Sequence, residues 1–252
     1  MMTFLTPPSS TLAERPPAQP SVRTVLDLRG VSKWYCRGES KTTVLDQVDL
    51  QVAAGQCVFL LGPSGSGKTT LLSIIGCVLS PDAGQVNVLG HDVQKLDPAA
   101  TALLRRDEIG FVFQKFHLIR GLTAQENVAV PLLLSGHSSQ QANKTALDRL
   151  GEVGLGDFAT KHPSRMSVGQ CQRVALARAL VAQPRLILAD EPTASLDAES
   201  GQQAMELLRQ LTVGTGKTII VVTHDHRILP YADRVLKVGS GKLSEASLAT
   251  SR

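Results

Sequence analysis

This 252-residue sequence lacks several features that define other classes of protein. Aromatic residues make up only 4% of it, and its four cysteines form neither a CxxC pair nor a metal-ligand spacing. Basic residues outnumber acidic ones by 26 to 22, but their longest cluster is Arg105-Arg106. No apolar run approaches the ~20 residues that cross a bilayer. The sequence therefore gives little support to nucleic-acid binding or a disulfide framework, and we expect a soluble protein of a reducing compartment.

Composition divides the chain into three parts. Residues 1–23 are rich in Pro, Ser and Thr and lack the apolar stretch of a signal peptide, which predicts a flexible leader. Residues 24–239 carry the periodic apolar pattern of a folded domain, and residues 240–252 form a polar tail that we expect to be loose. With 42% hydrophobic residues, the domain can bury a substantial core.

Apolar strands alternate with helical segments along the domain. Two short strands, at 24–35 and 42–56, are separated by a loop around Gly38 and predict an antiparallel β edge. The series that follows predicts an α/β fold with a mostly parallel sheet covered on both faces. A helical block at about 115–170 predicts an inserted helical lobe, in which Pro131 should kink or interrupt the first helix. Further strands are expected at 57–61, 85–90, 109–114, 185–190, 217–225 and 234–238, with a helix at 226–233.

A glycine-rich turn follows the first buried strand and opens a helix. Its sequence, GPSGSGKTT, matches the phosphate-binding pattern GxxxxGK[ST] of a P-loop NTPase in the required strand–turn–helix context. The glycines let successive N–H groups face the phosphates, Lys68 should reach the β- and γ-phosphates, and the Thr69 hydroxyl should ligate Mg²⁺. The predicted nucleotide-binding residues are Gly62, Pro63, Ser64, Gly65, Ser66, Gly67, Lys68, Thr69 and Thr70.

Two adjacent carboxylates end the apolar strand LILADE. The carboxyl ends of parallel strands are where ligands bind in open α/β sheets, so Asp190 and Glu191 should lie near the phosphates. We expect Asp190 to hold Mg²⁺ and Glu191 to orient and deprotonate the attacking water. A strand-end acidic pair that caps the next turn is the structural alternative, and the phosphate loop upstream makes it the weaker one.

Phosphate loop, glutamine, signature, acidic pair and histidine, in this order, resemble the nucleotide-binding subunit of ABC transporters. The resemblance runs from about Thr24 to Gly239. It implies that Gln114, in FVFQ, senses Mg²⁺ or water and that His224, in VVTHD, contacts the γ-phosphate. Each of these alone could be an ordinary strand-end polar residue; their combined order carries the assignment.

Further roles are implied by the same resemblance. The segment MSVGQCQR resembles the family signature LSGGQ, whose residues contact the nucleotide held by a second copy in a homodimer. SLD, at 195–197, resembles the loop that crosses between the two copies. Tyr35 is similar to the aromatic residue that stacks on adenine, with Trp34 as its rival and strand packing as the alternative role. The signature residues expected at the nucleotide are Ser167, Gly169 and Gln170.

One departure from the signature concerns its third residue. Val168 stands where the family usually has glycine, and a β-branched side chain resists a positive φ and adds bulk near the phosphate. We expect hydrolysis to survive, with an altered rate or dimer closure. Cys171 directly follows the signature and is either an exposed thiol or a helix residue without a role. Cys57 and Cys77 lie in apolar runs, so they are expected in the core.

The stretch at 88–136 looks most like lipoprotein-release and macrolide-export systems. That resemblance implies a peripheral ATPase, using ATP and Mg²⁺, on the cytoplasmic face of the inner membrane. Its partners would be a separate transmembrane permease and a periplasmic adaptor. Its function would be export or the release of lipoproteins or other amphiphiles. A soluble ABC ATPase of cofactor assembly or repair is the alternative, while a metabolic P-loop kinase would explain neither MSVGQ nor His224.

Overall fold

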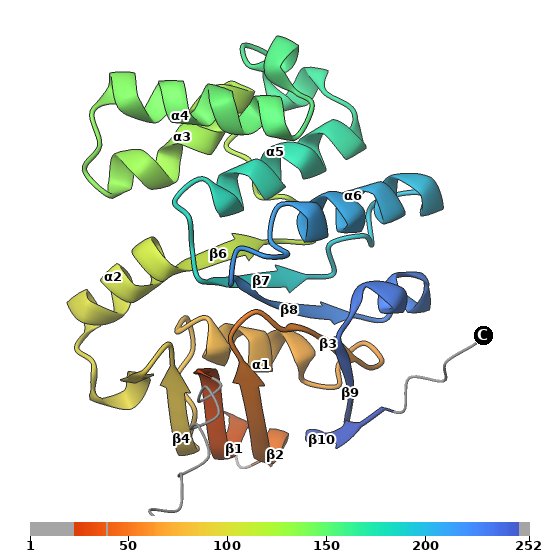
Figure 1. The fold of residues 1–252 in the computed structure, drawn as a ribbon. Helices are drawn as coiled ribbons and strands as arrows, with labels where there is room; N and C mark the ends of the chain where they lie inside the picture. Colours follow the sequence, from red (N-terminus) through yellow and green to blue (C-terminus); the bar gives the residue numbers. More distant parts are fainter. Residues whose placement is uncertain (1–22, 39, 247–252) are drawn as a thin grey trace, which may run out of the picture.

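A computed structural model describes residues 23–38 and 40–246 and arranges them as two β-sheets with helices between and around them (Figure 1). The larger sheet is parallel except for its antiparallel edge strand Lys242–Glu245. This confirms the mostly parallel sheet expected from the alternating pattern. In spatial order its strands are β10 (Lys242–Glu245), β9 (Arg234–Gly239), β3 (Cys57–Leu61), β8 (Thr218–Thr223), β7 (Leu186–Asp190) and β6 (Ile109–Val112).

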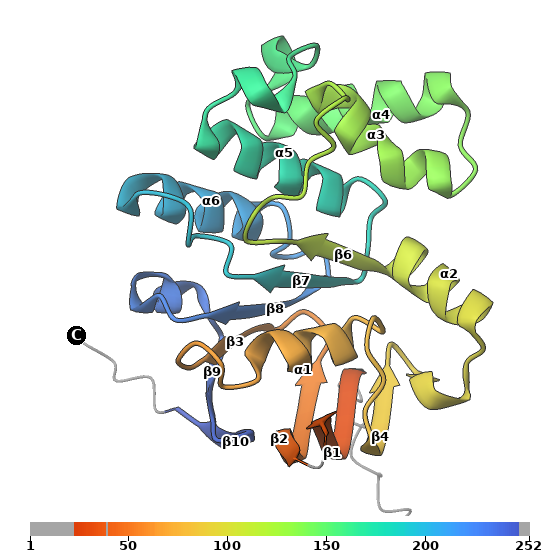
Figure 2. The same ribbon diagram turned by 180° about the vertical axis from the view of Figure 1, so that it is seen from behind.

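The central strands of this sheet are buried on both faces. Along β3, Val58 and Leu60 join one hydrophobic core, whereas Phe59 and Leu61 join another. Successive side chains of a strand point to opposite faces, so a continuous apolar run of this kind suits a sheet covered on both sides. Helix α1 (Lys68–Ile75) covers the first face, and it lies between the two sheets (Figures 1 and 2). Helices α5 (Val168–Leu180) and α6 (Ala198–Gln210) cover the second.

The second sheet confirms the antiparallel pairing expected for the two N-terminal strands, but it is separate from the parallel sheet rather than its edge. Strands β1 (Thr24–Arg37) and β2 (Ser40–Ala53) are each 14 residues long rather than short. Together with β4 (Ala83–Val88) and β5 (His91–Asp92) they form a separate sheet in the order β2-β1-β4-β5. The β1–β2 pairing contains several register shifts, which bend long strands and increase their twist. The segment 85–90 was expected as another strand of the alternating series. Its first part belongs to β4, which pairs with β1 in the antiparallel sheet instead.

A helical region with its own core rises above the parallel sheet in Figure 1. It contains α3 (Ala124–Leu134) and α4 (Ser139–Glu152), packed with α5 around buried alanine, valine and leucine side chains. Pro131 does not interrupt α3, which was one of the two effects expected of it. The helix continues past it to Leu134, and the Ser135 amide donates to the Pro131 carbonyl at 3.1 Å, so helical hydrogen bonding is present after the proline.

Three boundaries differ from those expected. The tail after residue 240 is not loose throughout, because β10 pairs with β9. The segment expected as a helix at 226–233 is the 3₁₀ helix η4 (His226–Tyr231), which contains Pro230. Helix α5 begins at Val168, with Ser167 as its N-cap, so the last three residues of MSVGQ are the first turn of the helix. The remaining elements are η1 (Val93–Lys95), α2 (Pro98–Glu108), η2 (Gly156–Phe158) and η3 (Pro163–Arg165).

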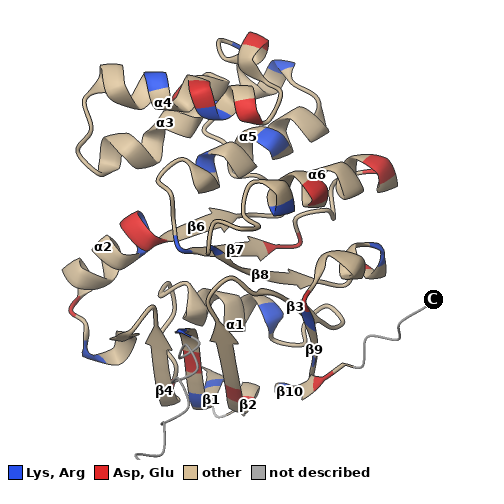
Figure 3. Cartoon of the chain, in the orientation of Figure 1, with Lys and Arg blue, Asp and Glu red and all other residues tan. Residues whose placement is uncertain are grey.

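Two further features concern the helices and the charged side chains. Within residues 23–38 and 40–246, none of the helices combines the length and apolarity needed to cross a bilayer. Figure 3 shows lysine and arginine interspersed with aspartate and glutamate over the helices of the upper region. The expected leader at 1–23 lies, except for Arg23, outside the described residues.

Candidate functional site

The phosphate loop lies at the carboxyl edge of the parallel sheet, between β3 and α1. Gly65 and Gly67 have φ of 79° and 98°, in the left-handed region that side chains with a Cβ avoid. Gly67 is also the residue from which α1 begins, so the loop leads directly into a helix N-terminus. Because β3, β8 and β7 are parallel neighbours, the residues that follow them meet at this same edge.

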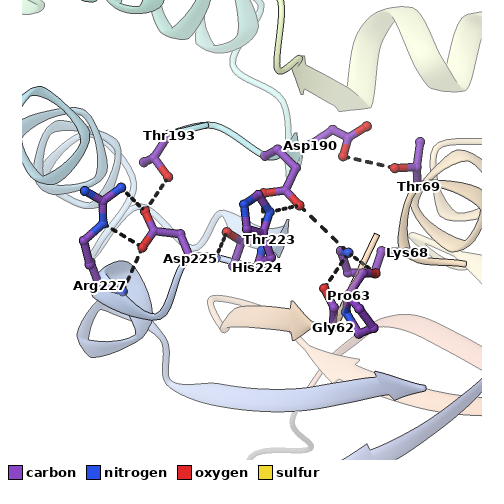
Figure 4. Close-up of polar contacts among 11 residues, drawn as sticks. Gly62, Pro63, Lys68, Thr69, Asp190, Thr193, Thr223, His224, Asp225 and Arg227 are labelled. Carbon is purple, nitrogen blue, oxygen red and sulfur yellow. Dashed lines mark hydrogen bonds and ion pairs between the residues drawn. The ribbon is translucent and has the colours of Figure 1, made fainter. Parts of the chain in front are cut away.

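Lys68 places a cation at the centre of the loop. Its side chain is 6% exposed, and its ammonium donates to the carbonyls of Gly62 at 2.7 Å and Pro63 at 2.9 Å. It also lies 3.9 Å from Glu191 Oε1 (Figure 4). Nearby, the buried Ser66 hydroxyl has no hydrogen-bond partner among the described residues. A buried ammonium, an unpartnered hydroxyl and a helix N-terminus together fit a phosphate group.

Asp190 and Thr69 bring together two oxygen atoms that could serve as metal ligands. The Thr69 hydroxyl donates to Asp190 Oδ1 at 3.3 Å. Burial raises the pKa of Asp190, and the Glu191 carboxylate acts in the same direction, against the Thr69 hydrogen bond and the Lys68 charge. The described part of the chain contains no cluster of three His, Cys, Asp or Glu residues that could hold a metal alone. This pair suits Mg²⁺, which takes few protein ligands and completes its shell with phosphates and water.

The Glu191 carboxylate meets His224. The main chain of Glu191 has φ of 47°, and its N–H donates to the Val222 carbonyl at 2.9 Å. His224 Nδ1 lies 2.9 Å from Oε1, and the His224 amide donates to Oε2 at 3.3 Å (Figure 4). The carboxylate is only 12% exposed, so it is fixed next to the loop in an orientation that could accept a proton from water.

Gln114 follows β6 by two residues, and its side chain is exposed. The Ser195 hydroxyl donates to its carbonyl at 3.2 Å, which brings the segment after β7 alongside the loop after β6. Two of the expected residues are thus linked: Gln114 and the SLD segment meet beside the acidic pair, because β6 and β7 are parallel neighbours.

The signature residues lie apart from the phosphate loop within one chain. Ser167 and Gln170 form a capping box at the start of α5: the Gln170 amide donates to Ser167 Oγ at 3.2 Å and the Ser167 amide to Gln170 Oε1 at 3.0 Å. With Gly169 they line a separate cavity of about 260 Å³. Val168 does not have a positive φ, so the expected backbone strain is absent; its side chain is 50% exposed.

The two aromatic rings at the end of β1 have different surroundings. Lys41 Nζ lies 3.7 Å from the centre of the Trp34 ring, and the Trp34 side chain is half-buried. Tyr35 is 49% exposed, which leaves it the more accessible surface for a base.

The cysteines expected in the core are buried there. Burial raises the pKa of Cys57 to about 12 and that of Cys77 to about 11. Cys171 is buried as well, with its thiol 3.6 Å from the Pro163 carbonyl, and burial raises its pKa. It is therefore not an exposed thiol.

A charged network behind His224 escaped the sequence analysis. Asp225 accepts bonds from the Arg227 side chain at 2.8 Å and from the Thr193 hydroxyl at 3.1 Å (Figure 4). The bond from Arg227 is the main reason that the pKa of Asp225 falls to about 2. The network ties the turn after β8 to the turn after β7, and so supports both His224 and Glu191. The only signal in the sequence was the aspartate directly after His224 in VVTHD.

Comparisons of the sequence with known proteins agree on one family. The model of the ABC transporter family matches residues 45–194. The macrolide export ATP-binding/permease protein MacB of Salmonella typhimurium is 44% identical over 219 residues, which are 87% of this chain and 34% of MacB. MacB of Photorhabdus laumondii is 41% identical over 226 residues, 90% of this chain and 35% of that protein. The chain thus spans about a third of the length of these relatives.

Two solved structures share the fold. A dimeric structure of the ATP-binding cassette MJ0796, in a post-hydrolysis state bound to ADP and Pi, has a TM-score of 0.81 and 41% identity, with 87% of this chain and 98% of that chain covered. CbiO1 of Clostridium perfringens, part of the ABC transporter complex cbiONQ, has a TM-score of 0.78 and 27% identity, with coverage of 88% and 87%. These likenesses confirm the P-loop NTPase fold expected from the sequence.

Proposed function

The chain belongs to the ABC transporter family as an ATP-hydrolysing cassette, and on that premise we propose that it drives export or amphiphile release through a transmembrane permease. The observation that carries the site assignment is the convergence of Lys68, Thr69, Asp190 and Glu191 at one edge of the parallel sheet. These residues come from two separate segments of the chain, at the start of α1 and the end of β7, and together they supply a cation, a hydroxyl and two carboxylates with different surroundings.

Each group has a distinct task in the proposed reaction. The main-chain amides of residues 62–70 and the Lys68 ammonium would hold the phosphates, with Tyr35 stacked on adenine. Thr69, Asp190 and Gln114 would hold Mg²⁺, which supplies positive charge beside the phosphate oxygens. Glu191 would accept a proton from the attacking water, with His224 fixing its carboxylate and facing the γ-phosphate.

Two copies of the chain would form the complete site. The signature residues Ser167, Gly169 and Gln170 lie away from Lys68 within one chain, yet they occupy the N-terminus of α5, where an anion is favoured. In a homodimer they would contact the nucleotide held by the other copy. The dimeric structure of the related cassette MJ0796 supports this arrangement.

The permease would bind in a groove beside the upper helical region. A cavity of about 390 Å³ lies between α2, β6, α3 and α5, and its lining includes Val78, Phe113 and Leu134. Val78 and Leu134 are 65% and 66% exposed, and Arg105 and Arg106 also line the groove. An apolar groove with arginines suits an amphipathic segment of a partner. Such docking would hold the chain at the cytoplasmic face of the membrane, with a periplasmic adaptor joined through the permease.

A soluble role in cofactor assembly or repair has less support. The relatives described above are macrolide-export proteins and transporter cassettes. The exposed groove next to Gln114 is also readily explained by a permease segment, whereas a soluble ATPase would need another occupant.

Replacement of Glu191 by glutamine tests the catalytic assignment. Glu191→Gln keeps the size of the side chain but removes the proton acceptor, so we expect ATP hydrolysis to fall about 10²- to 10⁴-fold. Binding of a fluorescent ATP analogue should persist, and the protein should elute as a dimer with ATP. Glu206→Gln, which changes an exposed carboxylate on α6, should behave as wild type. Normal turnover by Glu191→Gln would remove Glu191 from this role.

The partner is tested with the same variant. Tagged Glu191→Gln protein with ATP should recover a membrane permease with a large extracytoplasmic domain from detergent-solubilised native membranes. Double replacement of Val78 and Leu134 by serine should abolish that recovery without changing ATP binding, because neither side chain belongs to the phosphate site. Recovery of soluble partners alone would favour the alternative role.

A further inference from the structure

The loop that follows β6 carries Gln114 and has an unusual main chain. Phe116 and His117 are successive residues with φ of 59° and 47°. Residues with a Cβ avoid this left-handed region, so two in succession have to be held by their surroundings. Within the loop, the Phe116 amide donates to the Phe113 carbonyl at 2.9 Å and the His117 amide to the Lys115 carbonyl at 2.6 Å. The carbonyls of Phe116 and His117 are bound from outside the loop.

Arg178 of helix α5 binds both of these carbonyls. Its guanidinium donates to Phe116 O through Nη2 and to His117 O through Nη1, each at 2.7 Å. The side chain is half-buried, and burial lowers the pKa of the guanidinium, with no carboxylate in the described residues offsetting it. Withdrawing a cation from water without a counter-ion costs free energy. The two hydrogen bonds to the Phe116 and His117 carbonyls offset part of that cost, and they hold the loop against α5.

The same loop is also bound at the carboxyl edge of the parallel sheet, where Asp190 and Glu191 lie (the catalytic edge). There the Ser195 hydroxyl donates to the Gln114 carbonyl at 3.2 Å. Gln114 therefore lies between one bond to the segment after β7 and a pair of bonds to α5. Figure 2 shows the chain leaving β6 and passing α5 on its way to α3.

Helix α5 connects three functional features. It begins at the capping box of Ser167, and Arg178 lies 11 residues later, about 16 Å along the helix axis. Arg178 also lines the groove in which Val78 and Leu134 are exposed. A displacement of α5, or a ligand in the groove, would act on Arg178 directly.

We propose that Arg178 is a positioning residue that locks the Gln114 loop to the signature helix, so that the position of α5 sets the position of Gln114 at the catalytic edge. The proposal rests on the proposed role of Gln114 at Mg²⁺. Arg178 does not itself contact the nucleotide in this scheme. It acts by holding the two left-handed carbonyls that follow Gln114.

Tryptic cleavage at Lys115 tests the lock without any nucleotide. Lys115 is exposed in the loop, and Lys144 is exposed on α4 and serves as the internal reference. In Arg178→Met, cleavage after Lys115 should rise about tenfold relative to cleavage after Lys144, because the loop opens more often. The matched control is Arg209→Met. Arg209 also donates to a main-chain carbonyl, that of Tyr231, but belongs to α6. Equal ratios in both variants would overturn the lock.

A double-mutant cycle tests the action through Gln114. If Arg178 works by placing Gln114, Arg178→Met should lower the hydrolysis rate about tenfold in wild type and cause almost no further loss in Gln114→Ala. The Mg²⁺ concentration needed for half-maximal binding of fluorescent ATP should rise in both single variants, while nucleotide binding itself persists. Arg178→Lys should recover only part of the effect, because one ammonium cannot reproduce the planar fork.

The outcomes separate the two proposals. Losses that multiply in the double variant would overturn the positioning role while leaving the ATPase assignment intact. An unchanged Mg²⁺ dependence in Gln114→Ala would instead contradict the proposed role of Gln114, and the cleavage at Lys115 would still report whether the lock exists. A merely structural arginine would change the melting temperature, as Arg209→Met is expected to do, but neither the ratio of cleavages nor the Mg²⁺ dependence.

Discussion

Adjacent carboxylates acquire different surroundings at the end of β7. Asp190 continues the strand, and its carboxylate meets the Thr69 hydroxyl. At Glu191 the main chain turns into the left-handed region, and its carboxylate meets His224 instead (Figure 4). A non-glycine residue in this region costs about 1–3 kcal/mol and persists only when its surroundings hold it, here by the bond from the Glu191 amide to the Val222 carbonyl. The strain is what separates the proposed metal ligand from the proposed base.

Asp225 is expected to stabilise the fold at neutral pH. Its pKa lies at about 2, against 3.8 for an ordinary aspartate, chiefly because Arg227 binds it. A carboxyl group whose pKa is lower in the folded chain than in the unfolded chain stabilises the fold at every pH above the pKa of the unfolded chain. This stabilisation is lost as the pH falls from about 4 toward 2. Asp225→Asn should therefore lower the free energy of unfolding by about 1–2 kcal/mol at pH 7. Urea denaturation should show the same loss at pH 5 and a smaller one at pH 3.

Asp148→Asn is the control for that measurement, because Asp148 is an exposed carboxylate on α4. It should unfold like wild type at all three pH values. If the loss in Asp225→Asn were as large at pH 3 as at pH 7, the stabilisation would come from packing rather than from the charged carboxylate.

Among the elements, the phosphate loop and the antiparallel pairing of β1 with β2 were predictable, whereas the pairing of β1 with β4 was not. The loop is specified locally, since glycines at 65 and 67, Lys68 and the flanking strand and helix all lie within a few residues. By contrast, β1 pairs with both β2 and β4, and the β1–β4 contacts join residues more than fifty positions apart. Strand pairing over such distances leaves no local pattern, so the segment 85–90 resembled one more strand of the parallel series.

Side-chain tethers were equally invisible in the sequence. Arg178 and Asn127 each bind main-chain carbonyls of the segment that joins β6 to α3, but arginine and asparagine in a helix usually face solvent. What identifies them is burial together with left-handed or irregular backbone nearby. Both properties depend on the assembled fold.

Asn127 is expected to fasten the start of α3. Its side chain is fully buried; Oδ1 accepts from the Ile119 amide at 2.7 Å, and Nδ2 donates to the carbonyls of Ile119, Leu122 and Thr123. Asn127→Ala would leave these main-chain groups without partners in a buried place, so we expect a loss of about 2–4 kcal/mol in the free energy of unfolding. Urea denaturation monitored by circular dichroism measures it.

The matched control is Asn143→Ala on α4, where the asparagine side chain makes none of these loop contacts. Its loss should stay within about 0.5 kcal/mol. Equal losses in the two alanine variants would mean that the Asn127 bonds add nothing beyond the asparagine volume.

At the scale of the whole molecule, the proposed active site is divided between two copies. The order of the motifs was evident in the sequence, but their distances were not: Ser167 and Gly169 line a cavity of their own, away from Lys68. Only the assembled chain shows that the signature caps a helix in the upper region while the phosphate loop lies at the sheet edge. Because the signature residues would contact the nucleotide only in the dimer, we expect Val168 to affect nucleotide-dependent dimerisation.

Val168 is expected to weaken that dimer. It is the first residue of α5, half-exposed between the two signature residues that would face the nucleotide, and its branched side chain limits how closely their amides approach a phosphate. In the Glu191→Gln background, Val168→Gly should therefore lower the ATP concentration that gives half-maximal dimer about tenfold, measured by light scattering. The monomer should lose no more than about 1 kcal/mol. Val213→Gly, at an exposed valine after α6, should leave the dimer unchanged. A weaker dimer in Val168→Gly would mean instead that the valine packs against the other copy, making the departure from glycine an apolar contact rather than an obstruction.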